Sequence, residues 1–222
     1  MSYWTDHPAV QRTRTLDAEG IARTAAALLD EDGAESLTMR AVAAALGVAP
    51  SSLYSRVRSL EDVLDLALDA TLGADAALQE IVRADTVGAA VLDELLLRHF
   101  RHLRRHPWAL QVLPRRALRG PHHLALSERL CRLLEHEGAR DPLAAAYALS
   151  NLVIGSAMTG ALDVEELSTP VDEDLAPVYA RLHAAGAADS ESVLRPGLVA
   201  LRTAFTAPGA APAGLSPGPA AP

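Results

Sequence analysis

Three histidines have a spacing that could serve chemistry. His99, His102 and His106 stand three and four residues apart, so a helix would carry them on one face. Two histidines four residues apart can hold a metal ion, which leaves a metal-dependent helical enzyme as a remote alternative. The same imidazoles, next to Trp108, also suit a pocket wall in which a few polar groups interrupt an apolar lining.

The sequence shows none of the common catalytic motifs. It has no Gly-rich phosphate loop, no H-E-x-x-H, no G-x-S-x-G and no paired-cysteine metal site. We therefore expect a protein that is not an enzyme and that uses no cofactor and no bound metal. The single cysteine, Cys131, excludes an internal disulfide and suits a reducing cytoplasm, where we expect the protein to act.

A second group of polar side chains lies within residues 38–58, where small hydroxyls and arginines are close together. Small side chains on the first turns of a helix let it enter a major groove closely, and hydroxyls can meet phosphates or base edges. The members of this group that we take as candidate DNA contacts are Thr38, Arg40, Pro50, Ser51, Ser52, Tyr54, Ser55 and Arg56.

Two short helices joined by a tight turn would position this group. The first has an apolar stripe at helical spacing, with Thr38 as its N-cap and Gly47 ending it. Pro50 suits the first turn of the second helix, where its missing N–H has no cost. The pattern predicts a helix-turn-helix whose second helix reads DNA. An ordinary helical hairpin is the alternative from composition alone.

Residues 16–69 resemble the N-terminal domain of the TetR family of transcriptional regulators, through L-T-M-R-A-V-A-A-A-L-G-V, then S-L-Y, then E-D-V-L-D. The resemblance implies that Thr38 and Tyr54 contact phosphates and that Arg40 is a candidate base reader. Arg56 stands where the family often has histidine and can still hold a phosphate. Leu60 stands where the family often has lysine, and it cannot. On the recognition helix the resemblance places Pro50, Ser51, Ser52 and Ser55.

The resemblance also implies a function. We expect a repressor that binds a palindromic operator in double-stranded DNA as a homodimer and is released by an unidentified small-molecule effector. A constitutive or architectural DNA-binding regulator without a ligand is the alternative. The formal net charge of −8 argues against nonspecific coating of nucleic acid, but a local basic patch can still bind DNA.

The expected organisation is all-α, with about nine or ten helices. Residues 1–15 form a flexible arm whose Arg12 and Arg14 could reach a minor groove, and residues 16–60 form the helix-turn-helix domain. Residues 61–206 form a helical effector-binding and dimerisation domain, and the Pro- and Ala-rich residues 207–222 a disordered tail. The predicted helices of the second domain are 87–106, 108–118, 122–137, 142–162, 173–185 and 196–206.

The helix 142–162 contains no charge over about the length of a membrane span. Its polar and small residues and its acidic flanks, Asp141 and Asp163, favour a buried helix over a membrane, so we expect no membrane association. One face should form the dimer interface, pairing with the last helix of the other subunit. The predicted interface residues are Leu149, Val153, Ser156, Ala157 and Gly160, with Leu198, Leu201 and Phe205 opposite.

The opposite flank of that helix carries Tyr147, Asn151 and Met158. We expect these residues to enclose an effector cavity with the helix 87–106, which would contribute His99, His102 and His106, next to Trp108. The imidazoles would orient a polar ligand or a ligand-bound metal. The alternative is that each imidazole bonds a nearby carbonyl or carboxylate and only satisfies the core.

Overall fold

The computed structural model describes residues 17–115, 118–160, 168–186 and 189–207, and within these ranges it is all-α, as predicted. The predicted arm and tail, with Arg12 and Arg14, and the end of the predicted helix 142–162 lie outside the described residues. The helices are α2 (Ala18–Asp32), α3 (Met39–Ala45), α4 (Pro50–Tyr54), α5 (Leu60–Ala74), α6 (Ala76–Arg83), α7 (Ala89–Arg105), α8 (Ala109–Val112), the 3₁₀ helix η1 (Leu113–Arg115), α9 (Pro121–His136), α10 (Pro142–Thr159), α12 (Pro177–Ala184) and α13 (Ser190–Thr206).

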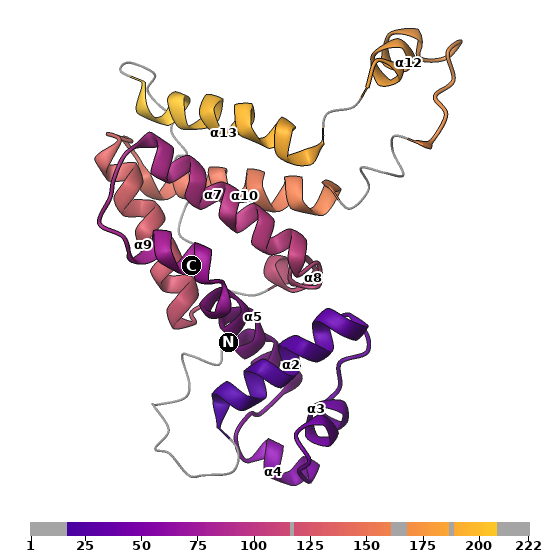
Figure 1. Ribbon diagram of the computed structural model, residues 1–222, viewed down its shortest axis with the longest axis vertical. Helices are drawn as coiled ribbons and strands as arrows, with labels where there is room; N and C mark the ends of the chain where they lie inside the picture. Colours follow the sequence, from indigo (N-terminus) through magenta and orange to yellow (C-terminus); the bar gives the residue numbers. More distant parts are fainter. Residues whose placement is uncertain (1–16, 116–117, 161–167, 187–188, 208–222) are drawn as a thin grey trace, which may run out of the picture.

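Helices α2, α3 and α4 form a small N-terminal unit, which we call the head (Figure 1). Its core is aliphatic and almost fully buried: Ile21, Leu29, Val42, Leu53 and Val57 are each at most 1% exposed. Because the apolar side chains of α3 and α4 fill this core, the other side chains of both helices face solvent.

The helix boundaries of the head follow from local chemistry. Thr38 Oγ1 accepts a hydrogen bond from the Ala41 amide at 3.0 Å and so caps α3, as predicted. Gly33 and Gly47 have φ of 78° and 67°, in the region that glycine adopts at low cost, and they end α2 and the turn after α3. Pro50 occupies the first turn of α4.

Helix α5 connects the head to the rest of the molecule. The Ser59 hydroxyl accepts from the Asp62 amide at 3.3 Å and caps its start. Its side chains are buried almost all round because α2 packs on one side and α9 on another. The contact with α9 is very close: a Cβ placed on Gly73 would lie 2.5 Å from His122 Nε2, and one on Gly120 would overlap the Asp69 carboxylate. Helix α5 therefore contacts both the head and the C-terminal helices.

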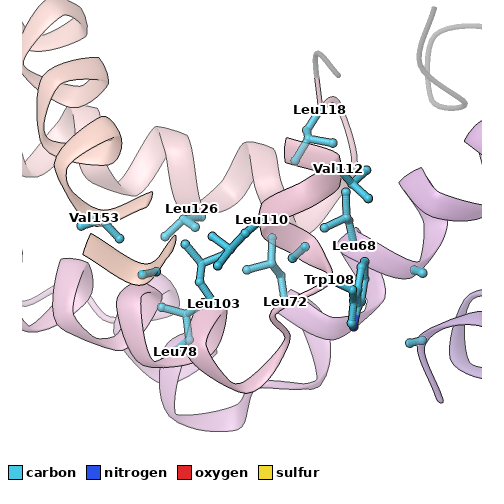
Figure 2. Close-up of a cluster of buried hydrophobic side chains, with 14 of the residues drawn as sticks. Leu68, Leu72, Leu78, Leu103, Trp108, Leu110, Val112, Leu118, Leu126 and Val153 are labelled. Atoms are coloured by element: carbon cyan, nitrogen blue, oxygen red, sulfur yellow. The ribbon is translucent and has the colours of Figure 1, made fainter. Parts of the chain in front are cut away.

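The C-terminal part is a bundle of α7, α9, α10 and α13, with α6 packed against α5, α7 and α9. Helix α8 lies at the end of the bundle nearest the head (Figure 1). Leucine side chains from several helices meet in its core, as Figure 2 shows for Leu72, Leu78, Leu103, Leu110 and Leu126. Trp108 lies beside Leu68 in the same cluster, at the boundary with the head.

Helix α10 buries only one face. That face packs on α7, α9 and α13, while Leu143, Tyr147 and Met158 are about half exposed or more. Among the described residues it is the one helix long and apolar enough to cross a membrane by length and composition alone. The expected buried helix is therefore buried on one side only within a single chain.

Three helix starts differ from the predictions. Helix α6 was not predicted separately; Asp75 breaks the chain after α5 and caps α6, with its Oδ1 accepting from the Leu78 amide. Helix α13 starts at Ser190, six residues before the predicted start, because Asp189 caps it and Pro196 is accommodated inside the helix. Helix α12 starts at Pro177 rather than 173.

Candidate nucleic-acid interface and effector cavity

The predicted DNA-contacting residues are all at least partly exposed on α3, α4 and the turn after α4. Arg40, Ser51, Ser52 and Ser55 are exposed, Tyr54 is 54% exposed, and Arg56 is half-buried. α3 and α4 lie at the end of the molecule farthest from α13 (Figure 1). A short helix presenting small side chains and a phenol at such an end has the shape that a major groove admits.

Two hydroxyls in this surface already have local roles. Thr38 Oγ1 accepts from the Ala41 amide, and Ser55 Oγ donates to the Ser52 carbonyl at 2.6 Å. Ser55 can therefore still accept a hydrogen bond but has no free proton to give. Leu60, which stands where the family often has lysine, is partly buried against the core.

A cavity of about 520 Å³ lies between α7, α9, α10 and the residues Leu113, Pro114, Leu118 and Arg119. Of the predicted pocket residues, His99, Tyr147 and Asn151 line it. The sequence reasoning missed the contribution of α9, which has no distinctive motif. The other lining residues are Leu95, Leu96, Leu113, Pro114, Leu118, Arg119, His123, Leu124, Leu126, Ser127, Leu130, Cys131, Leu143, Ala146, Ser150 and Ile154.

The cavity is apolar, with uncharged polar groups. His99 is 9% exposed, and burial, together with neighbouring His102 and His123, lowers its pKa to about 3, so its ring is neutral. Burial, with Arg119 nearby, also lowers the pKa of His123. Over the described lining there is no carboxylate, and Arg119 is the one arginine.

The pocket prediction was wrong for His102, which belongs to a buried polar network instead. Its Nδ1 lies 3.1 Å from Asp75 Oδ2 and its Nε2 3.4 Å from Thr71 Oγ1. Burial, the largest cause, lowers the pKa of His102 to about 4 although Asp75 opposes the shift. Arg105 also pairs with Asp75, and its positive charge contributes to the lowered pKa of that carboxyl.

The prediction was also wrong for His106, Trp108 and Met158. His106 Nδ1 lies 2.7 Å from Asp30 Oδ1, and Trp108 Nε1 donates to the same oxygen at 2.6 Å, so α2 of the head is tied to the end of α7. Met158 is half exposed. The three histidines share one helix face, but α7 passes from the cavity to the head along its length, so each ring meets a different neighbour.

The enzyme alternative finds no support in the site. In the parts of the chain that the structure describes, no three His, Cys, Asp or Glu side chains are placed to hold a metal ion.

The predicted dimer interface was wrong in its choice of face. Leu149, Val153, Ala157 and Leu198 are at most 1% exposed, because α10 packs on α13 of its own chain. Gly160 is buried too, and a Cβ there would meet Arg104 and Ser190. Ser156, Leu201 and Phe205 are partly buried in the same region. The most apolar face of α10 is taken by the chain's own core.

A second pocket of about 510 Å³ lies between α7 and the start of α13 and is rich in arginine. Arg98 pairs with Glu94 at 2.6 Å, Arg101 with Glu191 at 2.5 Å, and Arg105 with Asp75. With most of its cations already neutralised, this pocket offers little to an anion.

Comparisons with known proteins agree with the geometry of the head. Residues 21–66 match the family model described as bacterial regulatory proteins, tetR family. An HTH-type transcriptional regulator of Saccharopolyspora erythraea is 38% identical over 160 residues, which are 69% of this chain and 65% of that protein. The HTH-type transcriptional repressor DrrR1 of Streptomyces coeruleorubidus is 32% identical over 145 residues, 64% of this chain and 53% of the relative. The chain thus spans less than two thirds of the length of both.

Solved structures match over a larger share of the chain. A transcriptional regulator from Streptomyces coelicolor, described as a TetR, aligns with a TM-score of 0.70 and 25% identity over 86% of this chain and 98% of its own. The S. coelicolor TetR family protein ActR, in complex with (S)-DNPA, aligns with a TM-score of 0.63 and 25% identity over 86% of this chain and 98% of that one.

Proposed function

Because this chain belongs to the tetR family of bacterial regulatory proteins, we propose that it is a repressor that binds a palindromic operator and releases it when a small molecule fills the cavity. The observation that carries the proposal is the exposed surface of α3 and α4 on a fully packed head. It acts in the cytoplasm, where the DNA is. A selection of operator sequences from random DNA tests it: a recovered palindrome supports the proposal, and no sequence preference contradicts it.

The proposed DNA contacts are Thr38, Arg40, Pro50, Ser51, Ser52, Tyr54, Ser55 and Arg56. Arg40 is exposed at the start of α3 and has the length to reach a base, whereas Tyr54 ends α4 with a single hydroxyl suited to a phosphate. The two residues should therefore act differently on specificity.

Arg40→Ala should weaken operator binding by about 1–3 kcal/mol and relax the sequence preference, because a base contact is lost. Tyr54→Phe should weaken operator and scrambled DNA equally, because phosphates carry no sequence information. Affinities for both DNAs, measured at one salt concentration, check this. Gln111→Ala, exposed on α8, is the control and should change nothing. Uniform losses in both variants would show that Arg40 only positions the protein.

The proposed homodimer uses the exposed faces of α10 and α13, which pack beside each other. Apart from Arg195, which pairs with Glu191, the exposed side chains of both faces are uncharged, and most of them are apolar or small. On α10 it consists of Leu143, Ala144, Tyr147, Asn151, Gly155, Met158 and Thr159, and on α13 of Ser192, Val193, Pro196, Val199, Ala200, Thr203 and Ala204. A second copy would cover both faces and hold two heads on one operator.

Gly155 gives this proposal a specific test. A glycine inside a helix costs about 1 kcal/mol relative to alanine, yet a Cβ at Gly155 meets nothing in its own chain. Close approach of a second helix accounts for it. Gly155→Arg should therefore yield monomers in sedimentation and weaken operator binding, while Ala125→Arg, exposed on α9, should leave the assembly unchanged. A Gly155→Arg protein that stays fully dimeric would place the interface elsewhere.

The proposed effector site is the cavity lined by α7, α9 and α10. Its volume, about 520 Å³, falls in the range of small-molecule sites. ActR, which this chain resembles along most of its length, has been solved with (S)-DNPA bound. The ligand-free alternative would be favoured by an operator complex that no small molecule dissociates.

The contacts of α9 offer a path from the cavity to the head. The His123 amide, on a lining residue, donates to Asp69 Oδ1 on α5 at 2.9 Å, and α5 packs along α2. The Asp30 bonds to His106 and Trp108 tie α2 to the C-terminal bundle directly. An effector that moves the start of α9 would act on α5 and through it on the head.

A further inference from the structure

Two imidazoles in the cavity have no hydrogen-bond partner for their rings among the described residues. His99 is 9% exposed, lines the cavity and appears in no hydrogen bond or ion pair of the described chain. The His123 amide bonds Asp69, but its ring is likewise unpaired and lines the same cavity. His99 is buried and His123 half-buried, and neither ring is among the fully enclosed polar groups without a partner, so a molecule in the cavity can reach both. Polar side chains this deep in a folded protein are normally hydrogen-bonded, and an occupant of the cavity can supply the partner that both rings lack.

The lining excludes some occupants. The described part holds no carboxylate, so a buried ammonium group would have nothing to pair with. A full negative charge would lose its water among eight leucines and find neutral imidazoles, with the one arginine, Arg119, exposed. An uncharged body that fits leucine walls is favoured instead.

A neutral imidazole offers one N–H donor and one nitrogen lone pair. The nitrogen lone pair of an imidazole is a strong hydrogen-bond acceptor, so it bonds most strongly to a hydroxyl that is itself acidic. A phenol meets these conditions: its hydroxyl is an acidic donor, its oxygen can accept from the N–H of the second ring, and its ring is apolar.

We propose that the cavity takes a largely apolar, uncharged molecule carrying a phenol-type hydroxyl, which hydrogen-bonds the unpaired rings of His99 and His123. This inference rests on the proposed effector role of the cavity, and it adds the chemical class of the effector. Ser127, Ser150 and Asn151 lie on the same lining and are available for further polar groups of the molecule.

Matched probes with one bicyclic body test the class. Naphthalene, 2-naphthol, 2-naphthoate and 2-naphthylmethylammonium are titrated into the full-length protein at pH 7.5 without DNA, and the dissociation constants are compared. We expect 2-naphthol to bind about tenfold more tightly than naphthalene, the effect of one well-made buried hydrogen bond. Both ions should bind more weakly than 2-naphthol. Tightest binding by the carboxylate or the ammonium, or equal binding of naphthalene and 2-naphthol, would overturn the proposal.

Substitution of the two rings tests the residues. The double variant His99→Phe with His123→Phe keeps aromatic volume and removes the acceptors, so it should lose the preference for 2-naphthol while its affinity for naphthalene stays within about twofold. If the double variant does not fold, each single variant is compared in the same way, and a preference unchanged in both overturns the proposal. His136→Phe, exposed on the same helix α9 and outside the lining, is the control.

This test can fail separately from the proposed function. Probe binding is measured without DNA, so the wrong order of probes contradicts the ligand class even where a palindromic operator has been selected. Conversely, the expected order with no sequence preference in DNA contradicts the regulator and leaves the ligand class in place.

Discussion

Trp108→Ala should lower the free energy of unfolding by about 3–5 kcal/mol, the usual cost of removing a fully buried tryptophan. Trp108 is 2% exposed and lies beside Leu68 of α5 in the core next to the head (Figure 2). The substitution opens a space there and also removes the donor to Asp30, leaving the carboxylate that joins α2 to the bundle with one bond fewer. Urea denaturation followed by circular dichroism measures the change.

Asp30→Ala separates the two causes. It removes the bonds to His106 and Trp108 without emptying the core, so its cost should be nearer 1–2 kcal/mol, roughly that of hydrogen bonds to a charged group at a partly exposed site. If Trp108→Ala costs no more than Asp30→Ala, the packing of the indole contributes little and the prediction fails.

Acidification should destabilise the fold through His99 and His102. Their pKa values fall from 6.5 to about 3 and about 4 on folding, so the unfolded chain takes up protons first as the pH drops. Stability is therefore full above pH 6.5 and is lost as the pH falls below it. Between pH 7 and pH 5 each ring should cost about 2 kcal/mol, or roughly 4 kcal/mol together.

A variant isolates this effect from other titrating groups. His99→Leu removes one of the two rings, so its free energy of unfolding should fall by about 2 kcal/mol less than that of the wild type over the same pH interval. Urea midpoints at the two pH values give the comparison. Parallel pH dependences in the two proteins would mean that His99 is already protonated in the fold or never buried.

The structural features that the sequence could predict depend only on residues that are close together in the chain. Thr38, Gly47 and Pro50 act within one turn of their own helix, so their residue types alone indicate the two helices of the head. Tyr54 is exposed because its neighbours Leu53 and Val57 fill the core of the head. The roles of these residues in DNA binding remain predictions.

The cavity was only partly predictable because its wall comes from distant segments. Helix periodicity placed three histidines on one face but could not show where along α7 the neighbours change. Asp30 and Asp75, which take His106 and His102 away from the cavity, lie 76 and 27 residues away in sequence. His123 has no local signature at all, since only the packing of α9 against α7 and α10 brings it to the lining.

The prediction of which α10 face forms the dimer interface was wrong for a related reason. Apolar periodicity marks a face that must be covered, but not whether the chain itself or a second copy covers it. Leu149 and Val153 are covered by α7, α9 and α13 of the same chain, whereas the face around Gly155 is left exposed.

The close approach of α5 and α9 has a mechanical consequence. With no room for a methyl group at Gly73 or Gly120, and with Asp69 bonded to the first turn of α9, neither helix can slip along the other without a clash. We therefore expect the two helices to move together. A displacement of α9 beside the cavity would then reach α2 through α5, which packs against both.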